Sequence, residues 1–126
     1  MSGRSEPPVP LRLWRGVLVL LVAAICVLAF MPVPPQTLSS GWDKLNHAFA
    51  FATLAVTAGH GFPGRRRIAG IAVALVAFGG FIEVVQAFVP GRSSEWADLL
   101  ADGVGIAVGL AVLEAVQRLR GSAAPR

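Results

Sequence analysis

Long apolar runs alternate with short breaks along the chain. The apolar runs cover residues 11–31, 43–62, 68–89 and 96–119. Each run is close to the roughly 20 residues that an α-helix needs to cross a bilayer. The breaks contain prolines and glycines, which end helices and start turns. The pattern predicts an all-α, integral membrane bundle of four transmembrane helices.

The four predicted helices form one domain over residues 11–119, and we expect disordered cytoplasmic tails at residues 1–10 and 120–126. The first apolar run follows arginines, as the core of a secretion signal does. It is long, however, and no small-x-small cleavage site follows it. We therefore expect this segment to remain as a membrane anchor.

The composition also indicates a membrane protein. Hydrophobic residues make up 55% of the chain and charged residues only 14%, whereas soluble domains carry about 25% charged residues. The mean hydropathy is +0.67. Cys26 is the single cysteine, which excludes a disulfide framework and a thiolate metal site. We expect no bound metal and no other cofactor.

The basic residues fall into three groups, and only Lys44 and Arg92 of the eleven lie outside them. The groups are Arg4, Arg12 and Arg15; Arg65, Arg66 and Arg67; and Arg118, Arg120 and Arg126. With four spans, all three groups lie on one side of the membrane, which the positive-inside rule makes cytoplasmic. Both termini are therefore predicted to be cytoplasmic. Because topology explains the net charge of +4, we expect no nucleic-acid partner.

Polar side chains interrupt three of the runs at similar depths in the predicted outer leaflet. His47 lies roughly 6 Å into the second helix, and Gln86 roughly 6 Å before the end of the third, at 1.5 Å per residue. Glu83 and Asp102 lie roughly 10 Å and 9 Å from the outer ends of their helices. Ionisable groups at such depths are costly if they face lipid. We therefore expect a polar chamber that opens toward the outside.

The fourth helix carries a polar stripe that continues as a glycine stripe. Asp98, Asp102, Gly105 and Gly109 follow one another at helical spacing, so they share a face. The segment 105–109 is a small-xxx-small element, which lets two helices approach closely. We expect it to pack the fourth helix against the third at their cytoplasmic halves.

The candidate binding residues are Asp43, Lys44, His47, Glu83, Gln86, Arg92, Asp98 and Asp102. Arg92 is expected to neutralise one of the deep carboxylates, because its planar fork suits a carboxylate or a phosphate. Other interpretations stay open. Asp43 and Asp98 lie in first turns, where a carboxylate complements the helix dipole. Lys44 fits a solvated interface charge, and the deep polar groups fit a hydrogen-bonded lock between helices.

Three segments carry a family resemblance: DKLNHAFAFATLA (43–55), GGFIEVVQAFVPGRS (79–93) and DLLADGVGIAVG (98–109). In this order they resemble the VanZ-like family of small bacterial membrane proteins, over about residues 41–110. The resemblance maps the family pattern onto Asp43, Lys44, His47, Glu83, Gln86, Pro90, Gly91, Arg92, Asp98, Gly105 and Gly109. Asp102 departs from it, since the family often has asparagine there.

The resemblance implies a multi-pass protein of the bacterial inner membrane with a role in the cell envelope. The founding member of the family is associated with low-level resistance to teicoplanin, a lipid-anchored glycopeptide that acts outside the membrane. A shared fold does not transfer a chemistry, so the resemblance assigns no reaction.

Three functions fit the sequence. The favoured one is a binding module whose chamber holds the head group of a membrane lipid, a lipid-linked envelope molecule or an antibiotic. The second is an intramembrane enzyme, with His47 and Glu83 as catalytic acid-base candidates, or with these two and Asp102 around a divalent metal. The third is a structural or regulatory partner. The sequence predicts no particular oligomeric state.

Overall fold

The structure, a computed structural model, describes residues 8–32 and 40–122, and of residues 40–43 only the backbone. These ranges contain four α-helices: α1 (Leu11–Phe30), α2 (Ser40–Gly61), α3 (Ile68–Gln86) and α4 (Trp96–Ser122). A 3-10 helix, η2 (Arg65–Arg67), leads directly into α3. The described ranges contain no strand, so the all-α prediction is confirmed for them.

Three helix ends differ from the prediction by three residues, and the first is the start of α2, which lies at Ser40 and not at residue 43. The third helix ends at Gln86 and not at residue 89, because the amides of Phe88 and Val89 donate to carbonyls three residues back, at 3.0 and 3.1 Å. Pro90, which has no amide hydrogen, follows this turn. The fourth helix continues to Ser122. Residues 120–122 of the expected tail are thus helical, and residues 123–126 lie outside the described residues.

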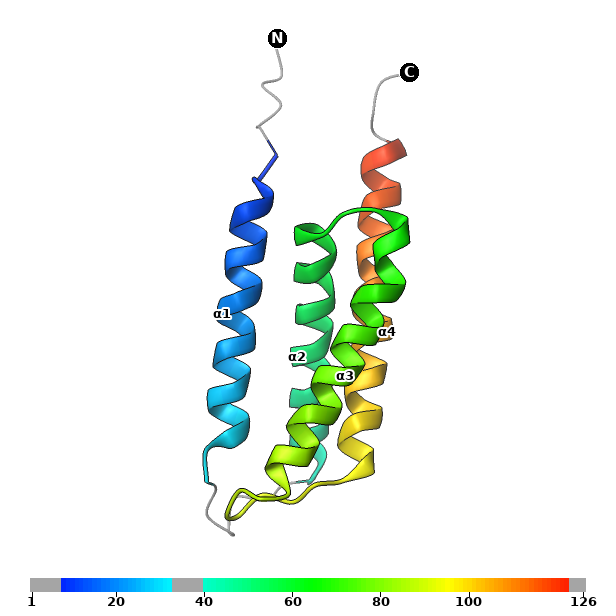
Figure 1. The fold of residues 1–126 in the computed structure, drawn as a ribbon. Helices are drawn as coiled ribbons and strands as arrows, with labels where there is room; N and C mark the ends of the chain where they lie inside the picture. Colours follow the sequence, from blue (N-terminus) through cyan, green and yellow to red (C-terminus); the bar gives the residue numbers. More distant parts are fainter. Residues whose placement is uncertain (1–7, 33–39, 123–126) are drawn as a thin grey trace.

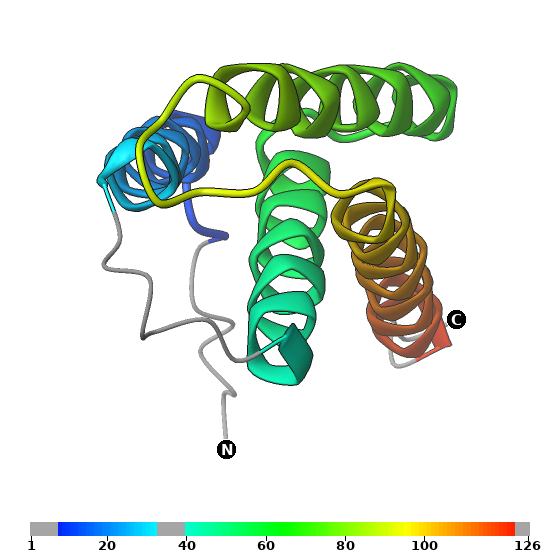
Figure 2. The same ribbon diagram turned by 90° about the horizontal axis from the view of Figure 1, so that it is seen from below.

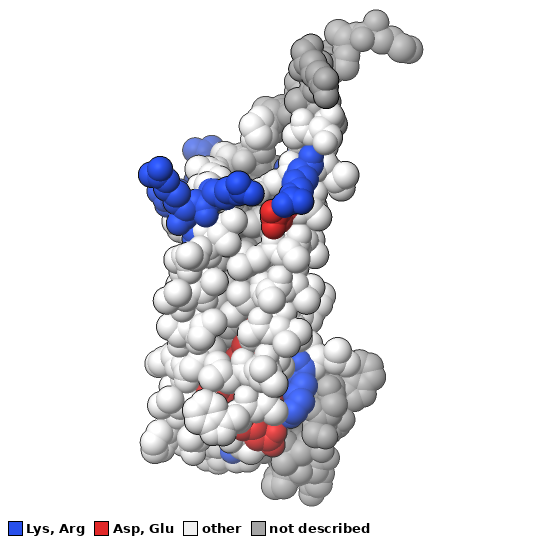
Figure 3. All heavy atoms as spheres, turned by 90° about the vertical axis from the view of Figure 1, so that its right-hand side faces the viewer, with Lys and Arg blue, Asp and Glu red and all other residues white. Residues whose placement is uncertain are grey.

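The helices run alternately down and up (Figure 1). The start of α1, the α2–α3 connection and the end of α4 therefore lie together at one end. We call this the basic end, after the arginines of η2 and Arg15 and Arg118. The opposite end is the acidic end, where Glu83, Asp98 and Asp102 lie. In Figure 3 the charged groups gather toward these two ends, with a mostly uncharged band between them.

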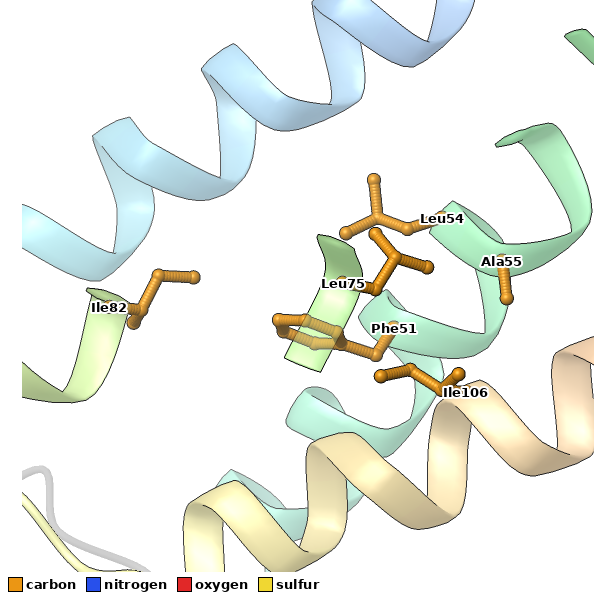
Figure 4. Packing of buried hydrophobic residues seen from close by; sticks show 6 residues of the cluster. All are labelled: Phe51, Leu54, Ala55, Leu75, Ile82 and Ile106. Atoms are coloured by element: carbon orange, nitrogen blue, oxygen red, sulfur yellow. The ribbon is translucent and has the colours of Figure 1, made fainter. Parts of the chain in front are cut away.

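The α2 helix occupies the centre of the bundle and contacts all three other helices (Figure 2). It contributes Phe51, Leu54 and Ala55 to the buried core, where they meet Ile106 of α4 and side chains of α3 (Figure 4). By contrast, none of the residues of α1 is buried. The α1 helix packs its partly buried apolar side chains against this core from outside.

Three helical segments are long and apolar enough to cross a membrane: Leu11–Phe30, Arg65–Gln86 and Trp96–Ser122. In the described part of the chain, α2 does not reach the same hydropathy. The polar residues near its two ends lower its hydropathy, namely Lys44, Asn46, His47 and His60. The outer faces carry exposed large apolar side chains such as Val19, Phe49 and Val73, as a membrane protein does.

The glycine stripe of α4 faces α2, and the prediction that it joins the third and fourth helices is wrong. A Cβ atom at Gly105 would lie 2.2 Å from the carbonyl oxygen of Ala48, and one at Gly109 would lie 2.5 Å from that of Ala52. The two backbones approach so closely only because both residues lack a side chain. The α2–α4 pair, rather than α3–α4, is therefore the tightest contact of the bundle.

The basic end is closed by contacts between α1 and the end of α2. The Nε–H of Arg15 donates to the carbonyl of Gly61 at 2.9 Å, and its guanidinium lies over the ring of Phe62, 4.6 Å from the centroid. Trp14 stacks on His60 with ring centroids 4.3 Å apart. The polar residues at this end hold two helices together, and the candidate site lies at the other end.

Candidate functional site

Three of the predicted residues converge at the acidic end. The Nδ1 atom of His47 is hydrogen-bonded to Oδ1 of Asp102 at 2.8 Å, with Nδ1–H as donor to the carboxylate. Glu83 joins this pair, since one ligand atom of each residue lies within 4.8 Å of the others. We call His47, Glu83 and Asp102 the three-helix cluster, because α2, α3 and α4 each supply one member.

The three-helix cluster is well shielded from solvent. Asp102 is 0% exposed and Glu83 8%, while the side chain of His47 keeps 14% of its surface. Gly79 of α3 makes room for Asp102, because a Cβ atom there would lie 2.7 Å from Oδ2. The missing side chain of Gly79 therefore allows the carboxylate of Asp102 to pack directly against α3.

The loop before α4 holds one oxygen of Glu83. The hydroxyl of Ser94 donates to Oε2 at 3.3 Å, and the backbone amide of Glu95 donates to the same atom at 3.2 Å. Oε1 is buried and has no hydrogen-bond partner among the described residues. The sequence analysis missed this role of Ser94. The available signal was its position in the short break between the third and fourth apolar runs.

Lys44 carries the counter-charge at the rim of the site. Its Nζ lies 3.0 Å from Oε2 of Glu95 and 3.6 Å from Oδ1 of Asp98. Asp98 is buried at 2% exposure, so it faces Lys44 in addition to lying in the first turn of α4. Through this contact, Lys44 and Asp98 hold the start of α2 against the start of α4. The side chain of Asp43 lies outside the described residues.

Arg92 does not contact the three-helix cluster, and the prediction that it neutralises a deep carboxylate is wrong. Its Nε–H donates to the carbonyl of Met31 at 3.0 Å, and Nη2 donates to the carbonyl of Leu28. The amide of Gln86 donates to the carbonyl of Ala29 at 3.1 Å. The final carbonyls of α1 have no intrahelical partner. Arg92 and Gln86 therefore attach the end of α1 to α3 and the following loop.

Two clefts reach the three-helix cluster. The first, the α1–α3 groove, has a volume of about 480 Å³ and exposes His47. Its polar lining residues are Asn46, His47, Gln86 and Arg92, and its apolar ones are Ile25, Leu28, Ala29, Ala50, Phe51 and Ile82. Asn46 was not among the predicted site residues, although it directly precedes His47.

The second cleft, the α3–α4 cleft, lies on the other side of α3. It has a volume of about 420 Å³ and reaches Glu83, Ser94 and Glu95. Its walls are otherwise mostly apolar: Gly80, Val84, Ala87, Phe88, Trp96 and Leu99. The three-helix cluster is therefore approached from two sides, at His47 from the groove and at Glu83 from the cleft.

A family model described as VanZ/LLP1 matches residues 14–117, which is most of the chain. The chain belongs to the VanZ/LLP1 family. The match includes all members of the three-helix cluster and the lining of both clefts, so the resemblance found in the sequence is confirmed. No curated protein and no solved structure matches the chain.

In this VanZ/LLP1 family member, the three-helix cluster has the elements of acid-base chemistry. Asp102 orients the ring of His47 by accepting its hydrogen bond, as a carboxylate does for a catalytic histidine. Glu83 adds a second carboxyl group within reach. The same atoms also form a set of one nitrogen and two oxygen ligands. The groove beside them has polar groups that suit the head of a lipid.

Proposed function

We propose that this VanZ/LLP1 family protein binds the head group of a membrane amphiphile in the α1–α3 groove, with a role in the bacterial cell envelope. The observation that carries the proposal is the graded lining of this groove. Its polar residues lie at the acidic end beside Leu28 and Ala29, and the apolar lining continues toward the middle of the bundle with Ile25, Phe51 and Ile82. A lipid, a lipid-linked envelope molecule and a lipid-anchored antibiotic all have this polarity.

The gradient follows from the directions of the helices. α2 runs away from the acidic end, so Phe51 lies one turn deeper than His47 (Figure 1). α3 runs toward that end, so Ile82 lies one turn deeper than Gln86. A ligand with its head at His47 and Gln86 therefore meets apolar walls along its chain.

An anionic head group fits the groove best. A guanidinium has five N–H donors, and within residues 8–32 and 40–122 two of those of Arg92 are used, both for α1 carbonyls. Its other donors remain for a phosphate or a carboxylate, which arginine binds in a planar fork. The amide of Asn46 lines the same groove. The carboxylates of Glu95 and Asp98 face Lys44 instead.

The proposal includes a topology with four spans in the bacterial inner membrane. In it, α2 crosses the membrane inside the bundle, the basic end and both termini are cytoplasmic, and the acidic end faces outward. The positive-inside rule supports this orientation, because the arginines gather at the basic end. Outward placement of the groove is consistent with ligands of the outer leaflet.

Cysteine labelling tests this topology. In a Cys26→Ala background, we expect a membrane-impermeant maleimide to label Ser93→Cys in intact cells and Pro63→Cys only after permeabilisation. Both positions are exposed, at opposite ends of the bundle. Labelling of Pro63→Cys in intact cells, with Ser93→Cys protected, would reverse the orientation. Labelling of both or of neither in intact cells would contradict the four-span arrangement.

Filling the groove tests ligand binding. Ala50 lines the groove, and we expect Ala50→Phe to weaken binding at least about tenfold, the effect of losing about 1.4 kcal/mol. The probes are phosphatidylglycerol, undecaprenyl phosphate and teicoplanin, measured by native mass spectrometry of the full-length protein. Ala69→Phe, at an exposed alanine of α3 near the basic end, is the matched control.

Equal binding by the Ala50→Phe and Ala69→Phe variants would contradict the groove as the binding site. Binding of none of the probes by the unaltered protein would favour a structural or regulatory role. Ala87→Phe, which fills the α3–α4 cleft instead, separates the two clefts. Binding that is lost only in this third variant would move the ligand to the other side of α3.

The second candidate function is an intramembrane acid-base enzyme, and the 2.8 Å contact between His47 and Asp102 favours it. Under this proposal the bound amphiphile is also a substrate, and Glu83 is the second acid-base group. Turnover that is lost in His47→Gln while binding of the same probe persists would support the enzyme. Binding of the probe without formation of any product would contradict the enzyme and agree with a binding protein.

A further inference from the structure

We propose that the three-helix cluster, formed by His47, Glu83 and Asp102, binds one divalent metal ion, either Zn²⁺ or Mn²⁺. The inference concerns the cluster itself and does not depend on the amphiphile proposed for the groove. Both metals accept a mixed set of imidazole and carboxylate ligands. Mg²⁺ and Ca²⁺ prefer sets made of oxygen alone.

The spacing of the ligand atoms is close to that of a metal site. One atom from each of the three side chains lies within 4.8 Å of the others. With metal–ligand bonds of about 2.0–2.2 Å, neighbouring ligand atoms are about 3.0–3.5 Å apart. The contact between His47 and Asp102 is already 2.8 Å long. A small shift of Oε1 of Glu83 toward the pair, together with loss of the proton between His47 and Asp102, would complete the set.

A separate observation points to a missing ligand. Glu83 is 8% exposed, and its Oε1 is a buried atom without a hydrogen-bond partner among the described residues. Buried polar atoms in folded proteins nearly always have a partner, and a bound ion is one of the accepted explanations for an exception. A cation held between Glu83 and the His47–Asp102 pair would provide that partner.

The surroundings of Glu83 resemble the outer shell of a metal ligand. Ser94 and the amide of Glu95 both donate to Oε2, which fixes the orientation of the carboxylate. Ligating carboxylates are commonly held in this way. The charge balance agrees, because four described carboxylates at the acidic end, those of Glu83, Glu95, Asp98 and Asp102, outnumber the two cations there, Lys44 and Arg92. A divalent cation would offset part of this negative charge.

Three protein ligands would leave at least one coordination position open, as catalytic metal sites do. The α1–α3 groove exposes His47 and the α3–α4 cleft exposes Glu83. A fourth ligand, either water or an oxygen of a bound molecule, would therefore have access from either side.

Metal titration of the purified full-length protein tests the proposal. The protein is stripped with EDTA and dialysed against ZnCl₂, MnCl₂ or MgCl₂, and bound metal is measured by elemental analysis. We expect close to one equivalent of Zn²⁺ or Mn²⁺ per chain and a higher thermal unfolding midpoint with that metal. Binding no greater than that of Mg²⁺ would overturn the proposal.

Variants locate the metal. We expect Glu83→Gln to weaken binding at least about tenfold, whereas Glu114→Gln should bind as the unaltered protein does. Glu114 is the matched control, because it is a glutamate that pairs with Arg118 at the basic end, away from the cluster. Equal affinities in the two variants would overturn the assignment of the ligands.

If Glu83→Gln does not fold, Co²⁺ substitution of the unaltered protein provides a second measurement. We expect visible absorption bands of a low-coordinate site, which Zn²⁺ displaces one for one. A spectrum like that of aqueous Co²⁺ would overturn the proposal. Failure of these tests leaves the groove proposal standing, because the Ala50→Phe comparison requires no metal.

Discussion

Replacing Gly105 by leucine is expected to prevent stable packing of α2 against α4. A Cβ atom at this position would lie 2.2 Å from the carbonyl oxygen of Ala48 and 2.9 Å from its Cα. Both are backbone atoms, which cannot rotate away as the end of a side chain does. The cost should therefore exceed the about 1–3 kcal/mol typical of overpacked cores.

The matched control for this prediction is Gly103→Leu, because a Cβ atom at Gly103 meets nothing within 4 Å. We expect Gly103→Leu to give monodisperse protein on size-exclusion chromatography, with an unfolding midpoint near that of the unaltered protein. Gly105→Leu should give aggregated or unstable protein. Similar behaviour of the two variants would contradict the close α2–α4 approach.

Replacing Asp102 by leucine is expected to have the second-largest effect. Leucine has nearly the shape of aspartate, but it cannot accept the hydrogen bond that His47 donates at 2.8 Å. A buried donor that loses its partner costs about 1–3 kcal/mol. Because Asp102 is 0% exposed, no solvent replaces the missing oxygen. Thermal unfolding of the purified protein should show a clear fall in the midpoint.

Asp102→Asn is the matched variant, since its side-chain oxygen still accepts a hydrogen bond from His47. We expect the unfolding midpoint of Asp102→Asn to fall by less than half as much as that of Asp102→Leu. Equal falls would show that charge, and not the hydrogen bond, is the contribution of Asp102. If Asp102→Asn also keeps full ligand binding, the cluster acts as a lock between helices rather than as a binding site.

The sequence predicted the depths of the polar groups well, because depth follows from counting residues along a helix. His47, Glu83 and Asp102 were placed within a few ångström of one level, and the structure brings them together. Counting residues along a helix could not identify which neighbouring helix packs against each of its faces. The stripe through Gly105 was expected to face α3, and it faces α2. Periodicity defines a face of a helix, but not which neighbour packs against it.

The partners of Arg92 were also beyond reach of the sequence. A cation near several acids was expected to pair with one of them. Instead, Arg92 donates to the carbonyls of Leu28 and Met31, more than 60 residues away in the chain, as separations of 64 and 61 residues show. Backbone acceptors at a helix end are present in every sequence with a helix. A search of the sequence for charged side chains therefore cannot identify such backbone acceptors.

The graded lining of the α1–α3 groove affects how selective such a site must be. In a bilayer, a groove at this depth meets lipids at the high local concentration of the leaflet, so weak intrinsic affinity is enough for occupancy. All lipids of the leaflet have acyl chains, so contacts with the apolar part of the groove do little to distinguish one lipid from another. Recognition of one species over the others then depends on the few polar atoms at the mouth of the groove, chiefly those of Asn46, His47 and Arg92.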